Sequence, residues 1–454
     1  MRRRRIAIGI GANVIDQSAI IVIQLLAVAL LVRFWGGERF GLWTMLTAIP
    51  AMLALGDLGF GAAAGVRMTM ELALGKTDEA AKTLRGAIRV IALASLAIIA
   101  LAALAIGLGQ SLVLQWVPEL RKGELFLLPA ALAIYAIAVL FSGLSQALLR
   151  SSGRFAQGML LSTFTNVLES TLLFAAAGAG LGLAWAAAAW AAGRLVGVCL
   201  QWLAAARLVP ALTDGWWRPA PGRVRALVNP SLAAISLPLA RTALLQGTVV
   251  ALGAVAGTAL VPAFVVARTL SRIGLQGTQL LTTALMPEFG GAAAQGHIHS
   301  VQRMVVLVTG VALVIAMPFA VVLAIAGPWF IKVWSGGQIT APAGLLAVMA
   351  LSALLGGLWT PLSNLLLAVN RQAEFALIFA TLAVGGVLLT WLTAATLGSV
   401  APAVALALTD LAMLGVIGRL VARSWAKDGA LVETARELIA ESWLKFGRLL
   451  GRQT

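Results

Sequence analysis

Residues 2–32 read RRRRIAIGIGANVIDQSAIIVIQLLAVALLV: four arginines precede a long apolar run that starts at Ile6. An α-helix of about 20 apolar residues crosses the hydrocarbon core of a bilayer, so this run predicts a transmembrane helix. It is too long for the apolar region of a cleaved signal peptide, and it has no clear small-residue cleavage site. We therefore expect it to be retained as the first membrane span.

The composition extends this interpretation to the whole chain. Of 454 residues, 61% are hydrophobic and 11% are charged, whereas soluble domains carry about 25% charged residues. Apolar windows of about 20 residues predict an all-α integral membrane protein with twelve transmembrane helices. The spans are expected near residues 6–32, 40–63, 87–109, 125–148, 157–178, 184–206, 229–255, 258–286, 303–326, 343–368, 375–396 and 400–422.

The positive charge indicates the orientation of these spans. A net charge of +16 would suggest nucleic acid in a soluble protein, but here it lies in short loops, so we expect no nucleic-acid partner. With the N-terminus in the cytoplasm, twenty-four of the 33 Lys and Arg residues lie on that side and five on the other. The positive-inside rule therefore predicts a multi-pass protein with both termini cytoplasmic.

The chain is expected to divide into two similar halves. A basic, proline-rich linker at 207–228 separates an N-terminal six-helix lobe, 1–206, from a C-terminal six-helix lobe, 229–422. Six-plus-six repeats around a central cavity are typical of transporters that work by alternating access. A cytoplasmic tail, 423–454, has the spacing of an amphipathic helix, which would lie on the inner leaflet or dock on the helix bundle.

Several catalytic and cofactor classes are not indicated. Gly75-Lys76-Thr77 resembles the end of a phosphate-binding loop, but Met70 occupies the position of the required glycine. Both histidines lie in one loop without a cluster of metal ligands, and the single cysteine lies in an apolar segment. We therefore expect no metal, no cofactor and no enzymatic activity.

Short motifs spread over the whole chain resemble those of one transporter family. They are GGERFGLW at 36–43, GDLGFG at 56–61, ARTL at 267–270, LMPE at 285–288, GPW at 327–329 with VW at 333–334, and LAVNR at 367–371. Their order is similar to that in the polysaccharide-transport family. Its members are O-antigen and exopolysaccharide flippases of the multidrug/oligosaccharidyl-lipid/polysaccharide exporter superfamily.

The resemblance implies a two-lobed bundle in the bacterial inner membrane. Such a protein moves polyprenyl-pyrophosphate-linked oligosaccharides from the cytoplasmic to the outer leaflet, for surface polysaccharide assembly. The resemblance also implies a cationic central cavity that holds the pyrophosphate. Polysaccharide polymerase machinery is a candidate partner, although the chain could also act alone.

Three arginines in the predicted spans of the second half are candidates for this cavity. Arg268 and Arg272 are four residues apart on span eight, so they share a helix face, which Gln276 continues. Arg241 lies near the middle of span seven. The guanidinium group of arginine can donate two parallel hydrogen bonds to a pair of phosphate oxygens. Arg241, Arg268 and Arg272 therefore predict a substrate-binding site. Alternatively, they pair with acids of neighbouring spans and hold the bundle together.

The polar residues of the first half have two interpretations. Glu169 and Arg194 lie at similar depth in one hairpin, which predicts a structural ion pair, although Glu169 could instead line the cavity as a protonatable group. Asn13, Asp16 and Gln17 form a polar stripe on span one. This stripe should face the cavity, with Asn13 and Gln17 binding substrate and Asp16 a candidate for ion coupling.

Two further acids complete the predicted set. Asp410 is the mid-depth acid of the second half, and we expect it to pair with one of the three arginines there. Asp57 lies near the cytoplasmic end of span two, where a structural role at a helix end is expected.

The leading hypothesis is thus a flippase for an anionic, lipid-linked glycan, with the lipid bilayer as its surroundings. Membrane potential or an ion gradient would drive it, because no nucleotide site is indicated. One alternative is a multidrug exporter of the same superfamily, whose cavity should be rich in carboxylates. A second is a membrane glycan polymerase or ligase, which the short exported loops do not favour.

Overall fold

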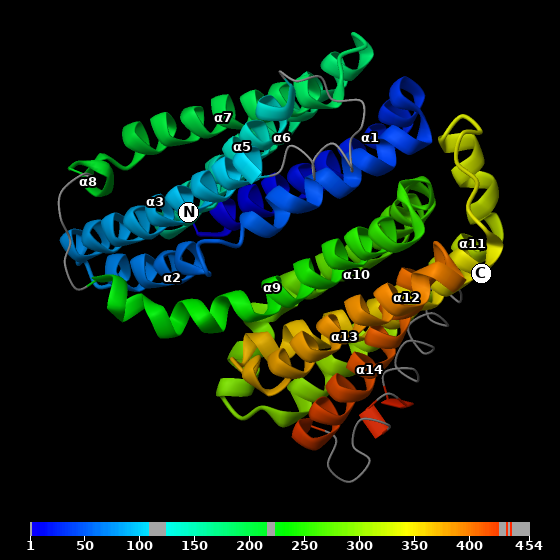
Figure 1. The fold of residues 1–454 in the computed structure, drawn as a ribbon. Helices are drawn as coiled ribbons and strands as arrows, with labels where there is room; N and C mark the ends of the chain where they lie inside the picture. The colour runs from blue at the N-terminus through cyan, green and yellow to red at the C-terminus, as the bar shows by residue number, and fades with distance from the viewer. Residues whose placement is uncertain (1, 109–123, 216–222, 426–432, 435, 438–454) are drawn as a thin grey trace, which may run out of the picture. The chain divides into compact units, whose positions relative to one another are not determined.

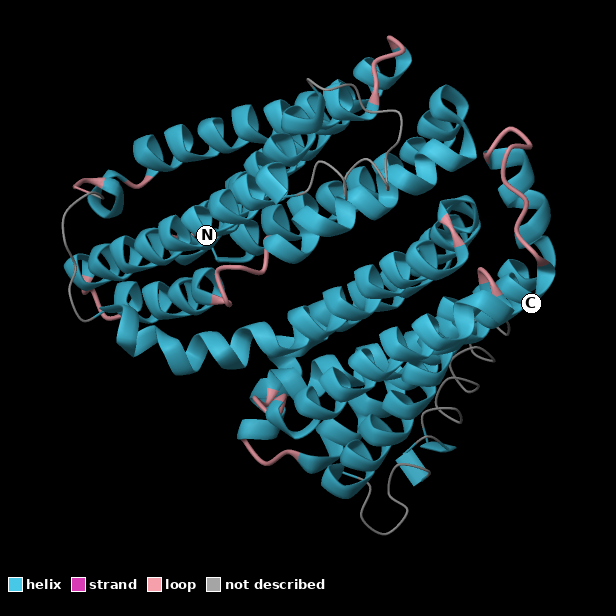
Figure 2. Ribbon diagram, in the orientation of Figure 1, coloured by secondary structure: helices cyan, strands magenta, loops and turns pink. Residues whose placement is uncertain are grey.

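The computed structural model describes residues 2–108, 124–215, 223–425, 433–434 and 436–437. The described residues form helices and loops without a strand, as Figures 1 and 2 show. In the first half of the chain the helices are α1 (Arg2–Leu53), α2 (Phe60–Ala73), α3 (Thr77–Leu108), α5 (Glu124–Ser151), α6 (Phe155–Gly178), α7 (Leu183–Leu208) and α8 (Pro210–Thr213). The second half holds α9 (Arg223–Ala256), a 3₁₀ turn (Thr258–Leu260), α10 (Val261–Ala294), α11 (Ile298–Trp334), α12 (Ala343–Ala368), α13 (Ala373–Leu397) and α14 (Val400–Trp425).

Eleven helices among the described residues are long and apolar enough to cross a membrane. One of them, α1, contains two predicted spans, because Gly36 has φ 79° and ψ 168° and breaks the helix. A side chain at this φ is strained, whereas glycine adopts it readily. The two segments of α1 and the ten other long helices thus correspond to the twelve predicted spans.

The second span differs from its prediction at its inner end. The expected continuous helix over 40–63 is wrong, because α1 ends at Leu53 and α2 begins at Phe60. Asp57 stabilises this break: its Oδ1 accepts a hydrogen bond from the Gly59 N–H at 3.0 Å, and its Oδ2 accepts one from the Gly61 N–H at 2.9 Å. Asp57 therefore caps the start of α2, which confirms the structural role predicted for it.

The chain forms two compact units. The first contains Met1–Pro262 and Trp334–Ile339, and the second contains Ala263–Val333 and Thr340–Thr454. In the first unit α9 packs against α1, α2 and α3, and the indole N–H of Trp334 donates to the Leu25 carbonyl at 2.9 Å. The predicted lobe boundaries at 206 and 229 stay a prediction, and the predicted amphipathic tail lies almost entirely outside the described residues.

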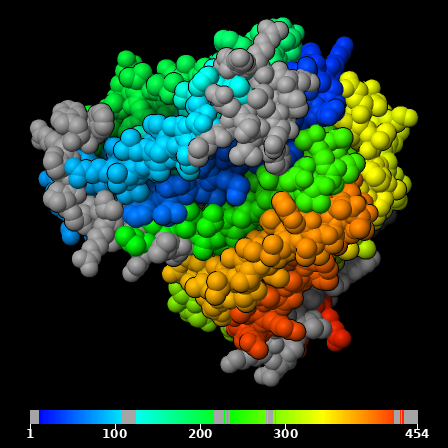
Figure 3. Space-filling view, in the orientation of Figure 1, coloured from blue at the N-terminus to red at the C-terminus, as the bar shows by residue number. Residues whose placement is uncertain are grey.

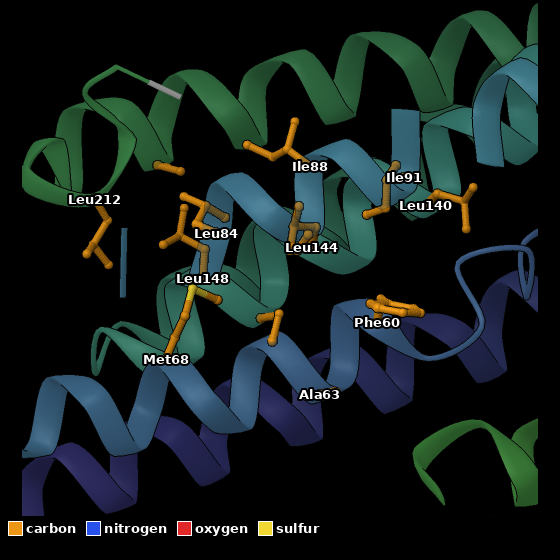
Figure 4. Close-up of a cluster of buried hydrophobic side chains, with 14 of the residues drawn as sticks. Phe60, Ala63, Met68, Leu84, Ile88, Ile91, Leu140, Leu144, Leu148 and Leu212 are labelled. Atoms are coloured by element: carbon orange, nitrogen blue, oxygen red, sulfur yellow. The ribbon is translucent and has the colours of Figure 1, made fainter. Parts of the chain in front are cut away.

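A hydrophobic core between α2, α3, α5 and α8 stabilises one end of the first unit. Figure 4 shows Met68, Leu84, Leu144 and Leu148 directed toward one another, and each is fully buried. Leu212 of α8 closes this core and is 1% exposed. Other large apolar side chains lie at the surface, including Leu377 and Leu392 on α13, which is orange in Figure 3. Exposed apolar side chains on long helices are expected in a bilayer, where lipid surrounds them.

Two glycines bring α6 and α7 into close contact. A Cβ atom at Gly193 would lie 2.5 Å from the Glu169 Cα, and a Cβ at Gly197 would lie 2.4 Å from the Thr165 Cγ2. The two form a GxxxG motif, which is typical of closely packed membrane helices. Because Arg194 directly follows Gly193, this packing holds its side chain beside α6.

The second unit is built in the same way around α12 and α14. Gly357 of α12 contacts Ala316 of α11, and Gly274 of α10 contacts the ring of Phe319. At the end of α14, the Trp425 carbonyl accepts a hydrogen bond from Gln302 at 2.8 Å. These contacts hold α10, α11, α12 and α14 together, and thereby position the polar residues of α10 and α14.

Candidate functional site

A line of polar side chains runs along α10 in the second unit. Arg268, Arg272 and Gln276 follow one another at intervals of four residues, and all three are half-buried. The Arg268 guanidinium carbon lies 5.4 Å from the centroid of the Phe264 ring. Arg268 and Arg272 are also close enough for their charges to interact. Two guanidinium groups thus share one face of α10, as predicted.

Gln276 extends this line by one turn. Its Oε1 atom is buried and accepts no hydrogen bond from the described residues. A buried carbonyl oxygen without a donor costs about 1–3 kcal/mol, so such an atom suggests a place for a ligand or water. We name the set Arg268, Arg272 and Gln276 the α10 polar stripe.

Arg241 lies on a different unit. It is an exposed residue of α9, which packs with the first unit, whereas the α10 polar stripe belongs to the second. The prediction that Arg241 joins Arg268 and Arg272 in one cavity involves both units and stays a prediction.

Arg194 and Glu169 form a buried ion pair in the first unit. Arg194 Nη2 donates to Glu169 Oε1 at 2.7 Å, and the two side chains are 11% and 8% exposed. The structure thus contains the pair that the hairpin geometry predicts. The same Nη2 also lies 3.1 Å from the Tyr135 hydroxyl and 3.2 Å from Asn166 Oδ1, so the pair belongs to a four-residue cluster.

Aromatic rings enclose this cluster on one side. Tyr135 stacks on Trp190 with 3.4 Å between ring centroids, and Trp190 meets the edge of Trp43 at 5.5 Å. The Arg194 guanidinium carbon lies 5.3 Å from the Tyr135 centroid. An apolar enclosure strengthens the attraction between buried opposite charges and raises the cost of removing either one.

The polar stripe of span one is directed partly toward α6. Asp16 is buried, and its Oδ1 accepts a hydrogen bond from the Thr163 hydroxyl at 2.7 Å. Asn13 and Gln17 lie beside it on the same face of α1 and are half-buried. The structure therefore places a carboxylate between α1 and α6. The roles predicted for Asn13 and Gln17 in substrate binding, and for Asp16 and Glu169 in ion coupling, remain predictions.

Asp410 of α14 faces α12 within the second unit. Its Oδ2 accepts a hydrogen bond from the Ser352 hydroxyl at 2.6 Å, and its Oδ1 accepts one from the Trp359 indole N–H at 2.9 Å. From the sequence we expected an arginine as the partner of Asp410. The two neutral donors, Ser352 and Trp359, were not predicted.

The residues missed from the sequence were all neutral hydrogen-bonding partners: Tyr135, Thr163, Ser352 and Trp359. Each lies on a helix other than that of its charged partner, so no local spacing identifies the pair. For the Arg194 cluster, the GxxxG motif at 193–197 was an available signal, since it marks the face of α7 that approaches another helix. In the described part of the chain, no group of three or more His, Cys, Asp or Glu residues could hold a metal ion.

Comparisons with known proteins place this architecture among transporter folds. No protein-family profile and no curated protein matches the chain. An inward-facing structure of a multidrug resistance MATE family transporter of the MOP superfamily covers 91% of this chain and 99% of its own, with a TM-score of 0.71 and 14% identity. The lipid II flippase MurJ, in an inward closed conformation, covers 96% of this chain and 92% of its own, with a TM-score of 0.66 and 12% identity.

A third similar structure is a MOP superfamily transporter from Pyrococcus furiosus, described as having a binding pocket of reversed polarity. It covers 93% of this chain and 96% of its own, with a TM-score of 0.61 and 16% identity. At such identities the similarity shows the fold. The predicted all-α fold with transmembrane helices in two lobes is therefore confirmed.

Proposed function

We propose that this protein is a flippase that moves a polyprenyl-pyrophosphate-linked oligosaccharide from the cytoplasmic to the outer leaflet by alternating access. The observation that supports this most is the α10 polar stripe. Arg268 and Arg272 are close enough for their positive charges to repel each other. In addition, placing one arginine at the depth of the bilayer core costs several kcal/mol by the lower estimates. A diphosphate anion offsets this cost, because each guanidinium can bind two phosphate oxygens at once.

The comparisons support a transporter that is selective for charge. One similar fold belongs to a flippase for a lipid, lipid II, and another to a transporter whose binding pocket has reversed polarity. The second case suggests that the polarity of the binding pocket, and with it the function, can differ within one fold. A stripe containing two arginines suits an anionic headgroup, while the lipid tail stays in the bilayer.

The driving force proposed is the membrane potential or an ion gradient across the bacterial inner membrane. Moving one charge across the membrane is worth about 2.3 kcal/mol per 100 mV, and a negative cell interior drives an anion outward. Asp16 and Glu169 are the candidates for ion coupling, and Arg241, Asn13 and Gln17 for further substrate contacts. Both termini would be cytoplasmic, and polysaccharide polymerase machinery would take over the product.

A multidrug exporter is the second candidate, because a MATE family multidrug transporter shares the fold over 91% of this chain. Its cargo would be cationic, and a cation is repelled by Arg268 and Arg272. Transport of a cationic dye by the purified protein, unaffected by the α10 arginines, would support this alternative instead.

The experiment reconstitutes the full chain in vesicles with a fluorescent polyprenyl-pyrophosphate oligosaccharide and measures its transfer between leaflets. Arg268→Ala/Arg272→Ala should lower the initial rate by at least about a hundredfold, since each arginine loses one or more charge-assisted hydrogen bonds, each of which contributes about 1.5–3 kcal/mol. Lysine at both positions should give an intermediate rate, because it keeps the charge but loses the fork.

Arg371→Ala is the matched control, since it removes one positive charge from the surface of the same unit, where Arg371 pairs with Glu374. Its rate should stay near that of the parent protein. A double alanine variant that inserts normally and transfers the lipid at the parental rate would contradict the proposal.

A further inference from the structure

One face of α3 carries positive charge near the start of the helix. Lys82, Arg85 and Arg89 follow one another at intervals of three and four residues, so they project from the same side of α3. Leu84 and Ile91 lie on the opposite side and belong to the hydrophobic core in Figure 4. The three cations therefore face away from that core.

The two arginines of this face are not paired with acids. Both are half-buried, and within the described part of the chain neither forms a salt bridge. Nε of Arg85 is buried and donates no hydrogen bond there. Glu79, the acid closest to Arg85 along the chain, binds Lys82 at 2.8 Å. A guanidinium group that is partly removed from water without an acceptor is unfavourable, so an anion is expected beside these arginines.

The same face of α3 continues as an apolar surface. Leu93 and Leu96 follow Arg89 by four and seven residues, and each is more than half exposed. The distance along the helix from Arg89 to Leu96 is about 10 Å, which is within the roughly 15 Å depth of one leaflet of the hydrocarbon core. A molecule with an anionic head and an apolar chain can therefore contact both parts of this face at once.

We propose that Arg85, Arg89, Leu93 and Leu96, which we name the α3 lipid face, bind an anionic phospholipid of the surrounding bilayer. The two guanidinium groups hold the phosphate diester through charge-assisted hydrogen bonds, and an acyl chain lies along the two leucines. A headgroup with an ammonium group would bring a further positive charge toward the arginines, so a headgroup without one, such as phosphatidylglycerol, is favoured. This site lies in the first unit and does not depend on the proposed function.

The test measures binding of fluorescent phosphatidylglycerol to the purified full chain in a neutral detergent, with fluorescent phosphatidylcholine as the zwitterionic comparison. The parent should bind phosphatidylglycerol at least about tenfold more tightly than phosphatidylcholine. Arg85→Ala/Arg89→Ala should raise the Kd for phosphatidylglycerol at least about tenfold, because the charge-assisted hydrogen bonds to the phosphate are lost. A parental Kd in this variant, with the protein folded, overturns the proposal.

Arg150→Ala/Arg154→Ala is the matched control, since it removes the same two charges from the first unit. Arg150 lies in the last turn of α5 and Arg154 precedes α6, so the two flank a turn and do not form one helix face. The Kd for phosphatidylglycerol should change by less than about twofold. An increase as large as that of Arg85→Ala/Arg89→Ala would show that the net charge of the unit, and not the α3 lipid face, attracts the lipid, and would overturn the proposal.

Two competitors identify the source of the anion. Inorganic phosphate has no acyl chain, so it should displace phosphatidylglycerol only at concentrations at least about a hundredfold above the Kd of the lipid, because each buried CH₂ group contributes about 0.8 kcal/mol. Displacement near that Kd would show a simple anion site and overturn the lipid assignment. Polyprenyl pyrophosphate that binds the face more tightly than phosphatidylglycerol would assign it to the cargo and overturn the proposal as well.

A second arginine variant keeps the test decisive if the double alanine variant does not fold. Arg85→Gln/Arg89→Gln retains long polar side chains and removes both charges. A Kd for phosphatidylglycerol at least about tenfold above that of the parent supports the site. A parental Kd in this variant overturns it.

Discussion

Gly193 of α7 lies directly against the backbone of Glu169 on α6, so that a Cβ atom at position 193 would be 2.5 Å from the Glu169 Cα. No methyl group fits this space without moving one of the helices. The contact therefore sets the distance between α6 and α7, and with it the geometry of the ion pair that Arg194, the next residue, makes with Glu169.

Gly193→Ala should destabilise the protein. Overpacking of a tight contact costs about 1–3 kcal/mol, and here the backbone itself must move. Thermal unfolding of the purified chain should show a lower Tm. The control is Gly143→Ala on α5, where a new Cβ meets nothing within 4 Å. That variant should be at least as stable as the parent, since alanine favours a helix more than glycine does. Equal Tm values for both variants would contradict the close contact.

Removal of one partner of the buried ion pair should cost more than removal of both. Arg194→Met leaves the Glu169 carboxylate buried without its cation, at a cost of about 3–5 kcal/mol. Adding Glu169→Gln to this variant removes the remaining charge and should recover part of the loss. A double-mutant cycle on unfolding free energies measures the coupling between the two residues. Additive effects would show that the pair contributes no interaction of its own.

Asp57 should stabilise the start of α2 through its two acceptor oxygens. Asp57→Ala removes both hydrogen bonds to the backbone and should lower stability by about 1 kcal/mol. Asp57→Asn retains one acceptor and should lose less. Hydrogen exchange of the Gly59 and Gly61 amides is the local readout, and both should exchange faster in the alanine variant. Unchanged exchange there would argue against the cap.

Gln201 should join three helices through one side chain. Its Oε1 accepts hydrogen bonds from Ser142 at 3.0 Å and Ser145 at 2.6 Å, and its Nε2 donates to Thr165 at 2.8 Å. Gln201→Leu keeps the volume but leaves hydroxyl groups without this partner, so a loss of about 1–3 kcal/mol is expected. Gln157→Leu on the exposed start of α6 is the control for a Gln-to-Leu change, and it should leave the Tm nearly unchanged.

Several features followed from the sequence because they depend on local properties. The length of each apolar run predicts a membrane span wherever the run occurs. The interruption of helix α1 at Gly36 falls at the Gly36-Gly37 pair that separates the first two predicted spans. The Glu169–Arg194 pair was also accessible, because both residues lie in one short hairpin and their distance from its turn is counted along the chain. The end of α1 at Leu53 was not predicted, because Ala54, Leu55 and Leu58 continue the apolar run beyond it and Asp57 is the one charged residue in between.

The sequence by itself determined that this is an all-α protein whose long apolar helices can span a membrane. Burial of a helix in lipid depends on the apolar residues of that helix alone. The tertiary structure decided which neutral groups join the charges: Tyr135 at Arg194, Thr163 at Asp16, Ser352 and Trp359 at Asp410. Those contacts depend on the rotation and depth of helices that are distant in the chain, and close packing at glycines such as Gly193 and Gly356 fixes both.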